Sequence, residues 1–327
     1  MRPRYPILEF DPCRIEIVTP VHNRRLLTLR CLRSLSRIDR TGLTVHVIIV
    51  DDGSTDGTSE EISCLFPDVE IIRGDGNLWY TGGTNRGIEA ALKHNPDYIL
   101  TINDDTIFHE GFLLRLVRCA EAHPKSIVGA LLLSWSRPHE VFLVGSRWDT
   151  WYGGWRHAKG LTPWNVPQKA FDVDVIYGNC VLYPVDSIRQ NGLMNAAMLP
   201  HLFADIEYTT RMRKAGWRLL IEPSAYVWCQ PNRPPPPLLN QSIGSIFREL
   251  FLDSKSYRNL VQLFRARWYT APSRFLAIPA YVIVLIRLAL HAVLSGSDWP
   301  RWTDLPDTSH LKPDRTKIPK DSTKVVQ

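Results

Sequence analysis

Short hydrophobic runs alternate with stretches of helical spacing over the first hundred residues. Ile15 to Val18 is an apolar run that predicts a strand, and the next apolar residues recur at the spacing of a helix face, at Leu26, Leu29, Leu32 and Leu35. The run from Thr44 to Val50 is rich in β-branched residues, as expected for a strand buried on both faces. The pattern continues with a predicted helix at 57–65, a strand at 69–72, a helix at 81–94 and a strand at 98–102.

Strands that alternate with helices in this way form a parallel sheet with right-handed crossover connections. Ligands bind to such sheets beyond the carboxyl ends of the strands. Two acidic clusters, Asp51-Asp52 and Asp104-Asp105, come directly after predicted strands. We therefore expect an α/β fold in which both clusters lie on one edge, with a cation or a donor-rich ligand to compensate their carboxylates.

The pattern changes after Asn232-Arg233. Four consecutive prolines at 234–237 predict an extended segment that ends the α/β body. Apolar residues at helical spacing then predict a helix within 242–264. Phe275 to Leu294 is the most hydrophobic run of the chain, but it contains Pro279, Arg287 and His291.

The run at 275–294 has the length of a membrane span, yet its charges favour a helix that lies in the membrane interface. Basic residues precede it at Arg265, Arg267 and Arg274, and aromatic residues bracket it at Trp268, Tyr269, Trp299 and Trp302. A helix packed against a soluble body and a true membrane span are the alternatives.

Composition and charge sharpen this division of the chain. The sequence has 327 residues, of which 44% are hydrophobic and 22% charged, which excludes a collagen-like or wholly disordered protein. The net charge is +6, and residues 265–327 alone carry ten Lys or Arg against five Asp or Glu. The charge therefore indicates a membrane surface rather than nucleic acid. We predict a catalytic domain at 1–233, a helical, membrane-associating extension at 234–303 and a disordered tail at 304–327.

The cysteines and the N-terminus bear on the compartment. Six cysteines lie far apart, and no two of them form a Cys-x-x-Cys pair. This spacing indicates a reducing compartment and no structural zinc. Residues 1–12 lack the apolar core of a secretory signal, so we expect a cytoplasmic protein, peripheral on the inner face of the cell membrane.

The two acidic clusters predict different chemistry. Asn103-Asp104-Asp105 supplies hard oxygen ligands that suit Mg²⁺ or Mn²⁺ held together with substrate phosphates. Asp51-Asp52 could accept hydrogen bonds from a nucleobase or a ribose. Both clusters have a structural alternative, since Asp and Asn also form turns that cap the following helix.

The segment from Gly74 to Gly87 is unusually rich in glycine and opens a predicted helix. Its glycines, Gly82 and Gly83 among them, would let the backbone approach a diphosphate, and Arg86 would reinforce that contact. Trp79 and Tyr80 could stack on a sugar or a base. Packing of these aromatic side chains in the core is an equal alternative.

These segments together resemble the family 2 glycosyltransferases with the GT-A fold, a Rossmann-like mixed sheet flanked by helices. The resemblance rests on Thr19-Pro20-Val21-His22-Asn23, VIIVDDGSTDGT (47–58), GNLWYTGGTNRGI (76–88), YILTINDDT (98–106), YGNCVLYP (177–184) and FADIEYTTR (203–211). Their order and spacing match as well. Ser256-Tyr257-Arg258-Asn259 resembles an element that follows the core in rhamnosyltransferase-like members of bacterial surface polysaccharide synthesis.

The resemblance implies an inverting transfer of a sugar from a nucleotide-diphosphate sugar to a hydroxyl of a glycan or lipid-linked glycan acceptor, with a divalent metal. Asp205 matches the general base, and Glu207 would orient it or the acceptor. Asp105 would bind the metal, with Asp104 beside it nearer the ribose or diphosphate. The nucleotide would be held by residues of the earlier motifs, namely Thr19, Pro20, Asn23, Asp51, Asp52 and Asn103. Gly178 and Asn179 would line the acceptor side with Trp79 and Tyr80.

The sequence departs from the family pattern at two places. Ala204 stands where many relatives carry Glu, and Trp228-Cys229-Gln230 occupies the region where many relatives carry a metal-binding His. Arg211 follows Glu207 by four residues, so an ion pair on one helix face is its expected role.

Two other functions remain open from the sequence. Asp-Asp-Gly-Ser-Thr-Asp-Gly-Thr (51–58) superficially resembles the motif of a metal-dependent phosphatase or nucleotidyltransferase, although Ser54 stands where the first Asp is needed. A catalytically degenerate sugar-binding protein would explain Ala204. Four tryptophans between Trp148 and Trp164 offer faces for acceptor sugars, with core packing as the alternative.

Overall fold

The computed structural model describes residues 12–156, 158, 160–229, 238 and 241–294. Its first half confirms the predicted alternation of strands and helices, within one to three residues at most boundaries. The elements are β1 (Cys13–Val21), α1 (Arg25–Leu35), β2 (Leu43–Asp51), α2 (Thr58–Leu65), β3 (Glu70–Arg73), α3 (Trp79–Lys93) and β4 (Tyr98–Thr101).

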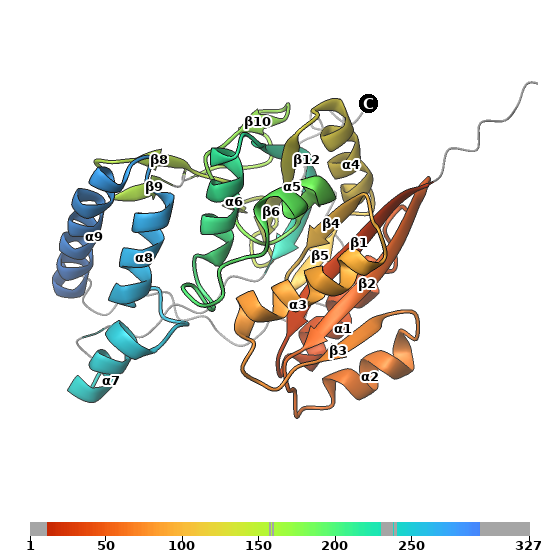
Figure 1. Ribbon diagram of the computed structural model, residues 1–327, viewed down its shortest axis with the longest axis horizontal. Coiled ribbons are helices and arrows are strands. Elements are labelled where there is room, and N and C mark those ends of the chain that lie inside the picture. Colours follow the sequence, from red (N-terminus) through yellow and green to blue (C-terminus); the bar gives the residue numbers. More distant parts are fainter. Residues whose placement is uncertain (1–11, 157, 159, 230–237, 239–240, 295–327) are drawn as a thin grey trace, which may run out of the picture.

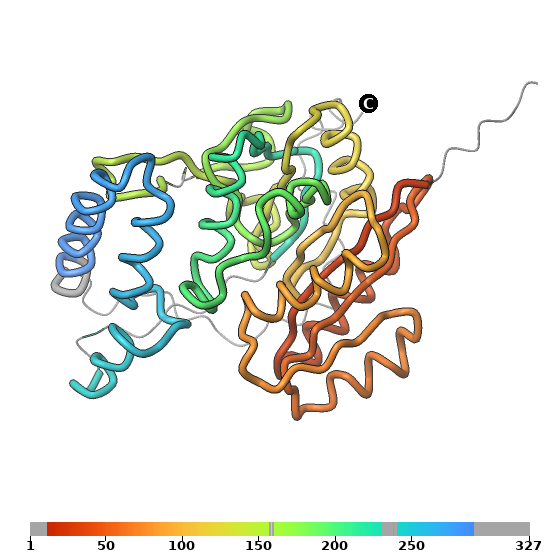
Figure 2. Tube along the Cα trace, viewed as in Figure 1, coloured from red at the N-terminus to blue at the C-terminus, as the bar shows by residue number. Residues whose placement is uncertain are grey.

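The second half adds short strands and three more helices to this unit. These are β5 (Thr106–Phe108), α4 (Phe112–Ala122), β6 (Ser126–Ser134), β7 (Val141–Leu143), β8 (Arg147–Asp149), β9 (Gly154–Arg156), β10 (Phe171–Asp172), β11 (Val181–Pro184), α5 (Val185–Asn191), α6 (Ala204–Lys214) and β12 (Arg218–Cys229). Figure 2 follows the chain from the N-terminal half on one side of the molecule to the C-terminal helices on the other.

The main sheet of the described residues has ten strands, eight of them in the order β10-β12-β6-β11-β4-β1-β2-β3. β1 pairs in parallel with β2 and β4, and β6 pairs in parallel with β12. β11 runs antiparallel between β4 and β6, so β6 and β12 point the same way as β4. The carboxyl ends of five central strands therefore meet at one edge of a mixed sheet, as the α/β prediction requires.

Helices cover both faces of this sheet. Ile15, Ile17 and Ile49 face a core that includes side chains of α1, α2 and α4. Alternate residues on the same strands, such as Val18 and Ile48, face a second core with α3, α5 and α6. The near-continuous hydrophobic sequence of β2 follows from this burial on two sides. The fold is thus a three-layer α/β unit (Figure 1).

The glycines of α3 serve packing more than a loop. α3 begins at Trp79, two residues before the predicted start, so Gly82 and Gly83 lie within the helix as the predicted range 81–94 implied. A Cβ on Gly83 would lie 2.8 Å from Cβ of Pro20, and a Cβ on Gly87 would collide with Val18 of β1. These two positions let the helix lie directly on the sheet beside the edge where the motifs gather.

The C-terminal helices form a separate layer beyond α6, at the end of the molecule opposite β3 and α2 (Figure 1). They are α7 (Ile243–Phe247), which continues as the π-helical turn η2 (Arg248–Leu252), α8 (Leu260–Thr270) and α9 (Arg274–Leu294). The single helix predicted within 242–264 is therefore interrupted at 253–259. At the end of this break, the Asn259 side chain accepts a hydrogen bond from the backbone N–H of Gln262 and caps α8.

This layer is anchored to the sheet unit by a buried arginine. The Arg267 guanidinium lies over the Trp155 ring, 4.9 Å from its centroid, and over Phe203 at 6.0 Å. Among the described helices, none combines the length and hydrophobicity needed to cross a bilayer. The predicted domain boundary at 233, the four prolines at 234–237 and the predicted disordered tail at 304–327 lie outside the described residues, as do Gln230, Trp299 and Trp302.

Candidate active site

The predicted site residues meet at the carboxyl edge of the sheet. Asp51 ends β2 and Asp52 follows it, and Asp104 and Asp105 come after β4, its neighbour but one. The segment 177–180 enters the same edge just before β11, and α6 begins beside it. Segments up to 150 residues apart in sequence thus contribute to one site.

The first acidic turn is held by hydrogen bonds to backbone amides. The Asp52 carboxylate accepts from Gly76 N at 2.8 Å and from Trp79 N at 2.9 Å. Asp51 accepts from Ser54 N at 2.9 Å and from the Ser59 hydroxyl. Both carboxylates are buried, and they fix the turns that surround the predicted nucleotide pocket.

Asn23 ties the end of β1 to the same turn. Its side-chain oxygen accepts from Thr55 N at 2.8 Å, and its backbone N–H donates to the Ser54 hydroxyl at 2.9 Å. Thr19 is buried, and Pro20 packs under α3. The end of β1 is therefore fixed beside the first acidic turn by the protein's own contacts.

The second acidic turn holds a cation from its own chain. Arg24 reaches from the start of α1 and places Nη1 2.9 Å from Oδ1 of Asp104 and Nη2 2.8 Å from Oδ2 of Asp105. The two carboxylate side chains are only 4% and 7% exposed, whereas the Arg24 side chain is 37% exposed. Burial raises the pKa of Asp104 to about 7, although Arg24 opposes the shift. A buried pair of carboxylates thus converges on one solvent-accessible cation.

Asn179 fixes the shape of this turn. Its side-chain oxygen accepts from Asn103 N at 2.9 Å, and its Nδ2 donates to the Thr106 hydroxyl at 2.9 Å. Asn179 is buried, so it positions the turn of Asp104 and Asp105 and does not face an acceptor.

Asp205 lies at the N-terminal end of α6, next to Gly178. Its Oδ2 accepts from Gly178 N at 2.7 Å, and its Oδ1 accepts from Ile206 N at 2.9 Å. Burial among protein atoms raises the pKa of the Asp205 carboxyl above its ordinary value, against the lowering effect of these amides. A carboxylate with a raised pKa is suited to accept a proton near neutral pH.

Aromatic side chains lie close to Gly178, the residue that holds Asp205. The Tyr80 hydroxyl donates to the Gly178 carbonyl at 3.2 Å, and Trp79 is 40% exposed. His201 meets both rings edge to face, with centroids 6.0 Å from Trp79 and 6.4 Å from Tyr80. Lys255, from the segment before α8, lies 5.1 Å from the centroid of Trp79.

His201 and Lys255 were not predicted from the sequence. Burial, and then the charge of Lys255, lower the pKa of His201 to about 4, so its imidazole is neutral near pH 7. Its Nδ1 is buried without a hydrogen-bond partner among the described residues. A buried polar atom of this kind beside two aromatic rings is a reason to place a substrate here.

Two further predicted residues lie away from the site's chemistry. Glu207 is buried and pairs with Arg211, whose Nε lies 2.9 Å from Oε1, as the i, i+4 spacing indicated. The same guanidinium donates to the carbonyls of Asn191 and Leu193, so the pair also fixes the loop after α5. Arg86 is exposed on α3 and has no hydrogen bond or ion pair with another described residue.

The tryptophans at 148–164 divide into packing and exposed residues. Trp148 and Trp155 contact each other edge to face across the β8–β9 hairpin, and Trp155 also lies under Arg267. Trp151 is 90% exposed. Core packing therefore explains two of the four.

Comparison with known proteins identifies this arrangement. A sequence profile of the family described as glycosyl transferase family 2 matches residues 16–188, more than half of the chain. The match contains both acidic turns and ends before Asp205. The chain is also 26% identical to the N-acetylglucosaminyl-diphospho-decaprenol L-rhamnosyltransferase of Mycobacterium tuberculosis over 223 residues, 61% of this chain and 70% of the relative.

Solved structures support the fold assignment. A crystal structure of GalNAc-T7 with UDP, GalNAc and Mn²⁺ superposes with a TM-score of 0.54 at 14% identity, over 85% of this chain and 57% of that chain. A crystal structure of S. aureus TarS (residues 1–349) superposes with a TM-score of 0.51 at 13% identity, over 86% of this chain and 72% of that chain. At these identities the likeness shows the fold, which is GT-A as predicted.

Proposed function

Because the chain belongs to glycosyl transferase family 2, we propose that it transfers a sugar from a nucleotide-diphosphate sugar to an acceptor hydroxyl with inversion. One observation carries this proposal. The consecutive residues Gly178 and Asn179 join the two halves of the site, since Gly178 N holds Asp205 and the Asn179 side chain holds the turn of Asp104 and Asp105. The base and the cation site are thereby fixed relative to each other, as in-line displacement requires.

Asp205 is the proposed general base. An inverting transfer needs a base on the face of the sugar opposite the leaving diphosphate, because the acceptor oxygen attacks in line. Asp205 has two oxygens, each with one backbone hydrogen bond, which leaves further lone pairs for the acceptor hydroxyl. The raised pKa matches a group that takes a proton during the reaction and then releases it.

The second acidic turn fits a divalent cation. Asp104 and Asp105 are buried carboxylates whose only ionic partner in the described residues is Arg24, and oxygen ligands of this kind suit Mg²⁺ or Mn²⁺. Asp105, with Asp104, would hold the ion once the more exposed Arg24 side chain moves aside. A bound ion supplies Lewis-acid compensation of charge on the leaving diphosphate.

The nucleotide is proposed to bind beside the first acidic turn. Asp51 and Asp52 use their carboxylates to fix the turns at 53–59 and 74–79, so these turns are shaped before the ligand arrives. Thr19, Pro20 and Asn23 lie at or just after the end of the neighbouring strand β1. The first amides of α3 already donate within the protein, Trp79 N to Asp52 and Thr81 N to the Pro200 carbonyl, so the diphosphate is proposed to be held at the second acidic turn and not by this helix end.

The acceptor is proposed to approach over Trp79, Tyr80 and His201. Aromatic faces bind the apolar faces of sugars, and a neutral imidazole offers one hydrogen-bonding atom for a hydroxyl. The M. tuberculosis relative is named for transfer of L-rhamnose to a lipid-linked N-acetylglucosaminyl diphosphate. We take L-rhamnose as the first donor sugar to test and a polyprenyl-diphosphate-linked sugar as the first acceptor.

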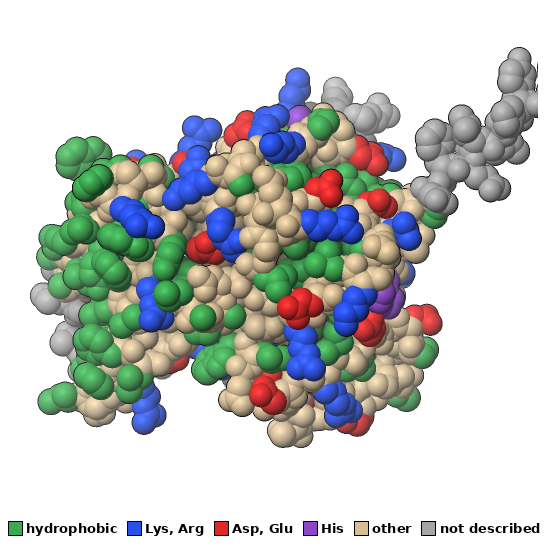
Figure 3. Space-filling view, viewed as in Figure 1, with side chains coloured by type: hydrophobic (Ala, Val, Ile, Leu, Met, Phe, Trp, Pro, Cys, Tyr) green, Lys and Arg blue, Asp and Glu red, His purple; other side chains and the backbone are tan. Residues whose placement is uncertain are grey.

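The C-terminal helices are proposed to bring the enzyme to an anionic membrane surface. α9 exposes one stripe along its length, formed by Phe275, Ile278, Val282, Ile286 and Leu290, and α7 and η2 expose Ile243, Phe247, Phe251 and Leu252. Hydrophobic side chains accordingly gather over this end of the molecule (Figure 3). Arg287, the charge within the run, donates to the Tyr152 carbonyl at 2.8 Å and lies over its ring, so the hydrophobic stripe is not interrupted by it.

Vesicle flotation tests the membrane surface. The protein is expected to float with vesicles containing phosphatidylglycerol, and a Phe275→Ser/Ile278→Ser variant is expected to stay in the protein fraction. Leu65→Ser is the matched control, because Leu65 is 46% exposed on α2 at the other end of the molecule. If the unaltered protein also fails to float, the membrane proposal is wrong and the transferase proposal stands.

A direct assay tests the transfer itself. The purified protein is incubated with Mn²⁺, a panel of nucleotide-diphosphate sugars and a lipid-linked N-acetylglucosaminyl diphosphate, and the product is identified by mass spectrometry. A product that requires acceptor and donor supports the proposal, and Asp105→Ala or a chelator should remove donor binding. Donor binding without any product would instead favour a catalytically degenerate sugar-binding protein.

A further inference from the structure

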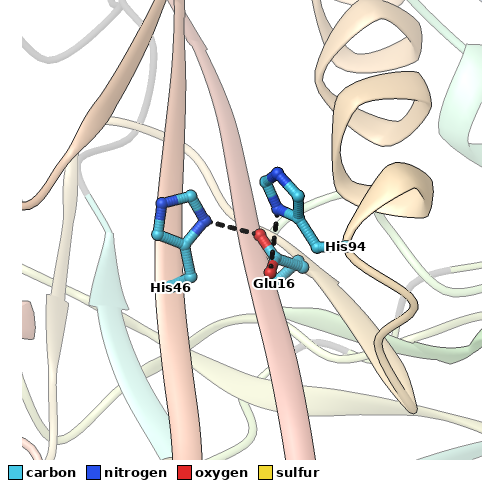
Figure 4. A group of neighbouring side chains, drawn as sticks. All are labelled: Glu16, His46 and His94. Carbon is cyan, nitrogen blue, oxygen red and sulfur yellow. Dashed lines mark hydrogen bonds and ion pairs between the residues drawn. The ribbon is translucent and has the colours of Figure 1, made fainter.

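A second cluster of ligand-type side chains lies at the opposite edge of the sheet, away from the candidate active site. Glu16 of β1, His46 of β2 and His94, the residue after α3, point toward one another (Figure 4). Glu16 and His46 are directly opposite each other in the parallel ladder. Three rigid elements thus hold these three side chains in place.

The geometry brings one atom of each side chain close to the others. His46 Nδ1 lies 2.8 Å from Oε2 of Glu16, and His94 Nδ1 lies 3.2 Å from Oε1 of the same carboxylate. One ligand atom from each of the three residues lies within 4.8 Å of the other two. The two imidazole rings meet edge to face with centroids 5.2 Å apart.

The charges of the cluster are not balanced by a basic side chain. Glu16 is 6% exposed, and its ionic contacts within the described residues are with the two imidazoles alone. Glu70 of β3 adds a second carboxylate, whose Oε2 lies 3.9 Å from Nε2 of His46 and 3.8 Å from Nε2 of His94. Two carboxylates therefore surround two imidazoles, and a buried carboxylate is stable only when it is compensated.

We propose that Glu16, His46 and His94 bind a divalent transition metal, with Zn²⁺ the best match. Two imidazole nitrogens and one carboxylate oxygen are a ligand set that zinc accepts, and Mg²⁺ prefers all-oxygen sites. Glu70 faces the outer nitrogen of both rings, which is the place of the carboxylate that orients metal-bound histidines. The partly exposed histidines leave room for water as a fourth ligand.

The metal needs a modest adjustment of the ligand side chains. Tetrahedral zinc with bonds of about 2.0–2.1 Å holds its ligand atoms about 3.3 Å apart. His46 and His94 contact different oxygens of Glu16, at 2.8 and 3.2 Å, and one ligand atom from each residue lies within 4.8 Å of the other two, so these atoms have to draw together by up to roughly 1.5 Å. Both histidines are partly exposed, so their rings can move without disturbing the core.

The alternative is that the imidazoles only donate hydrogen bonds to a buried carboxylate. That arrangement would explain Glu16, but it does not require Glu70 or a second histidine on a separate element. The metal would link β1 and β2 to the C-terminal end of α3, the helix whose N-terminal residues Trp79 and Tyr80 belong to the candidate active site. Fifteen helical residues separate the two ends by about 22 Å. The proposed ion is therefore distinct from the one at Asp105.

Zinc content and cobalt spectra test the proposal on the full chain without a histidine tag. After dialysis against Zn²⁺ and then buffer, the protein is expected to retain one zinc per chain at this site, and Co²⁺ is expected to give the visible absorption of a tetrahedral N/O site. His46→Gln and His94→Gln are expected to lose both signals. Glu70→Gln is expected to weaken zinc binding about 10- to 100-fold.

Two controls separate this site from the other candidates. Asp105→Asn removes the proposed catalytic ligand and should keep the zinc, and His139→Gln changes an exposed histidine elsewhere. Circular dichroism and the melting temperature of each variant show that it is folded. The proposal is overturned if the unaltered protein retains no more zinc than folded His46→Gln, or if zinc is lost only from Asp105→Asn.

Discussion

Replacement of Asp205 by Asn tests the assignment of the base with the smallest change of shape. The amide has the size of the carboxylate, and its oxygen can still accept from Gly178 N, where the carboxylate accepts at 2.7 Å. Its NH₂ group cannot accept from Ile206 N, so one hydrogen bond of α6 is lost. The variant can no longer take a proton from an acceptor hydroxyl.

The expected effects on activity and stability differ in size. General base catalysis contributes about 10²- to 10⁴-fold, so kcat should fall by that factor, a barrier increase of about 2.7–5.4 kcal/mol. The lost hydrogen bond costs about 0.5–1.5 kcal/mol of stability. Relief of the buried charge offsets this cost, since the raised pKa shows that folding disfavours the carboxylate form. We therefore expect the melting temperature to change little.

Three measurements separate chemistry from binding and folding. The rate of sugar transfer reports kcat, the shift of melting temperature with nucleotide sugar and Mn²⁺ reports donor binding, and the unliganded melting temperature reports stability. Asp186→Asn is the matched control, because Asp186 is an exposed aspartate at the first turn of α5.

The result that refutes the reasoning is equally specific. If Asp205→Asn keeps more than about a tenth of the activity, no proton passes to Asp205 in the slow step. If it loses donor binding together with activity, Asp205 acts on the donor side and not on the acceptor.

Four further predictions concern the groups around Asp205. Arg24→Met removes the guanidinium between Asp104 and Asp105, so Mn²⁺ should raise the melting temperature of this variant more than that of the unaltered protein. An equal rise in both proteins would contradict the proposal that Mn²⁺ displaces Arg24 from these carboxylates. Gly178→Ala should lower the transfer rate at least tenfold, because the new Cβ would lie 2.8 Å from Cβ of Asp205 and closer still to the Tyr80 hydroxyl. Gly244→Ala is the neutral control, because a Cβ there meets no atom within 4 Å. Glu207→Gln should lower the free energy of unfolding, measured by urea denaturation, by about 1.5–3 kcal/mol, because it weakens the ion pair with Arg211. If Glu207 is structural, the variant should keep its kcat at low temperature. In the pH profile of kcat/KM, the midpoint of the acid limb should lie above the ordinary pKa of Asp, about 3.9, because the carboxylate of Asp205 forms only as the pH rises through its raised pKa. A midpoint at or below that value would count against Asp205 as the base.

The sequence predicts the first sheet strands well because their signals are local. β1, β2 and β4 are hydrophobic runs with a Pro or Asp at or shortly after the strand end, namely Pro20, Asp51 and Asp104, and each is buried by the helix that follows or precedes it. The break between η2 and α8 was not predicted, since it depends on tertiary contacts. Arg258 of that connection pairs at 2.8 Å with Glu249, and both side chains are only 10% exposed.

The candidate site was predicted in part for the same reason. Asp51, Asp52, Asp104, Asp105 and Asp205 lie in motifs with fixed neighbours, and the structure brings them to one edge. Whether they act as proposed remains a prediction. His201, Lys255 and Arg24 belong to no local motif, because their relevance arises only where the fold brings residues 79, 201 and 255, or 24 and 104, together.

The two acidic turns differ in what they can exchange, and this difference supports the proposed place of the cation. Each oxygen of Asp52 accepts from a backbone amide that is fixed in the chain, so its turn is held in place by the protein itself. Asp104 and Asp105 share one guanidinium, which leaves two carboxylates and a single positive charge. A divalent ion would balance that pair, and the displaced Arg24 would then be free to face the diphosphate of a donor. Metal binding at this edge would therefore replace one cation by another, between carboxylates that the fold already holds together.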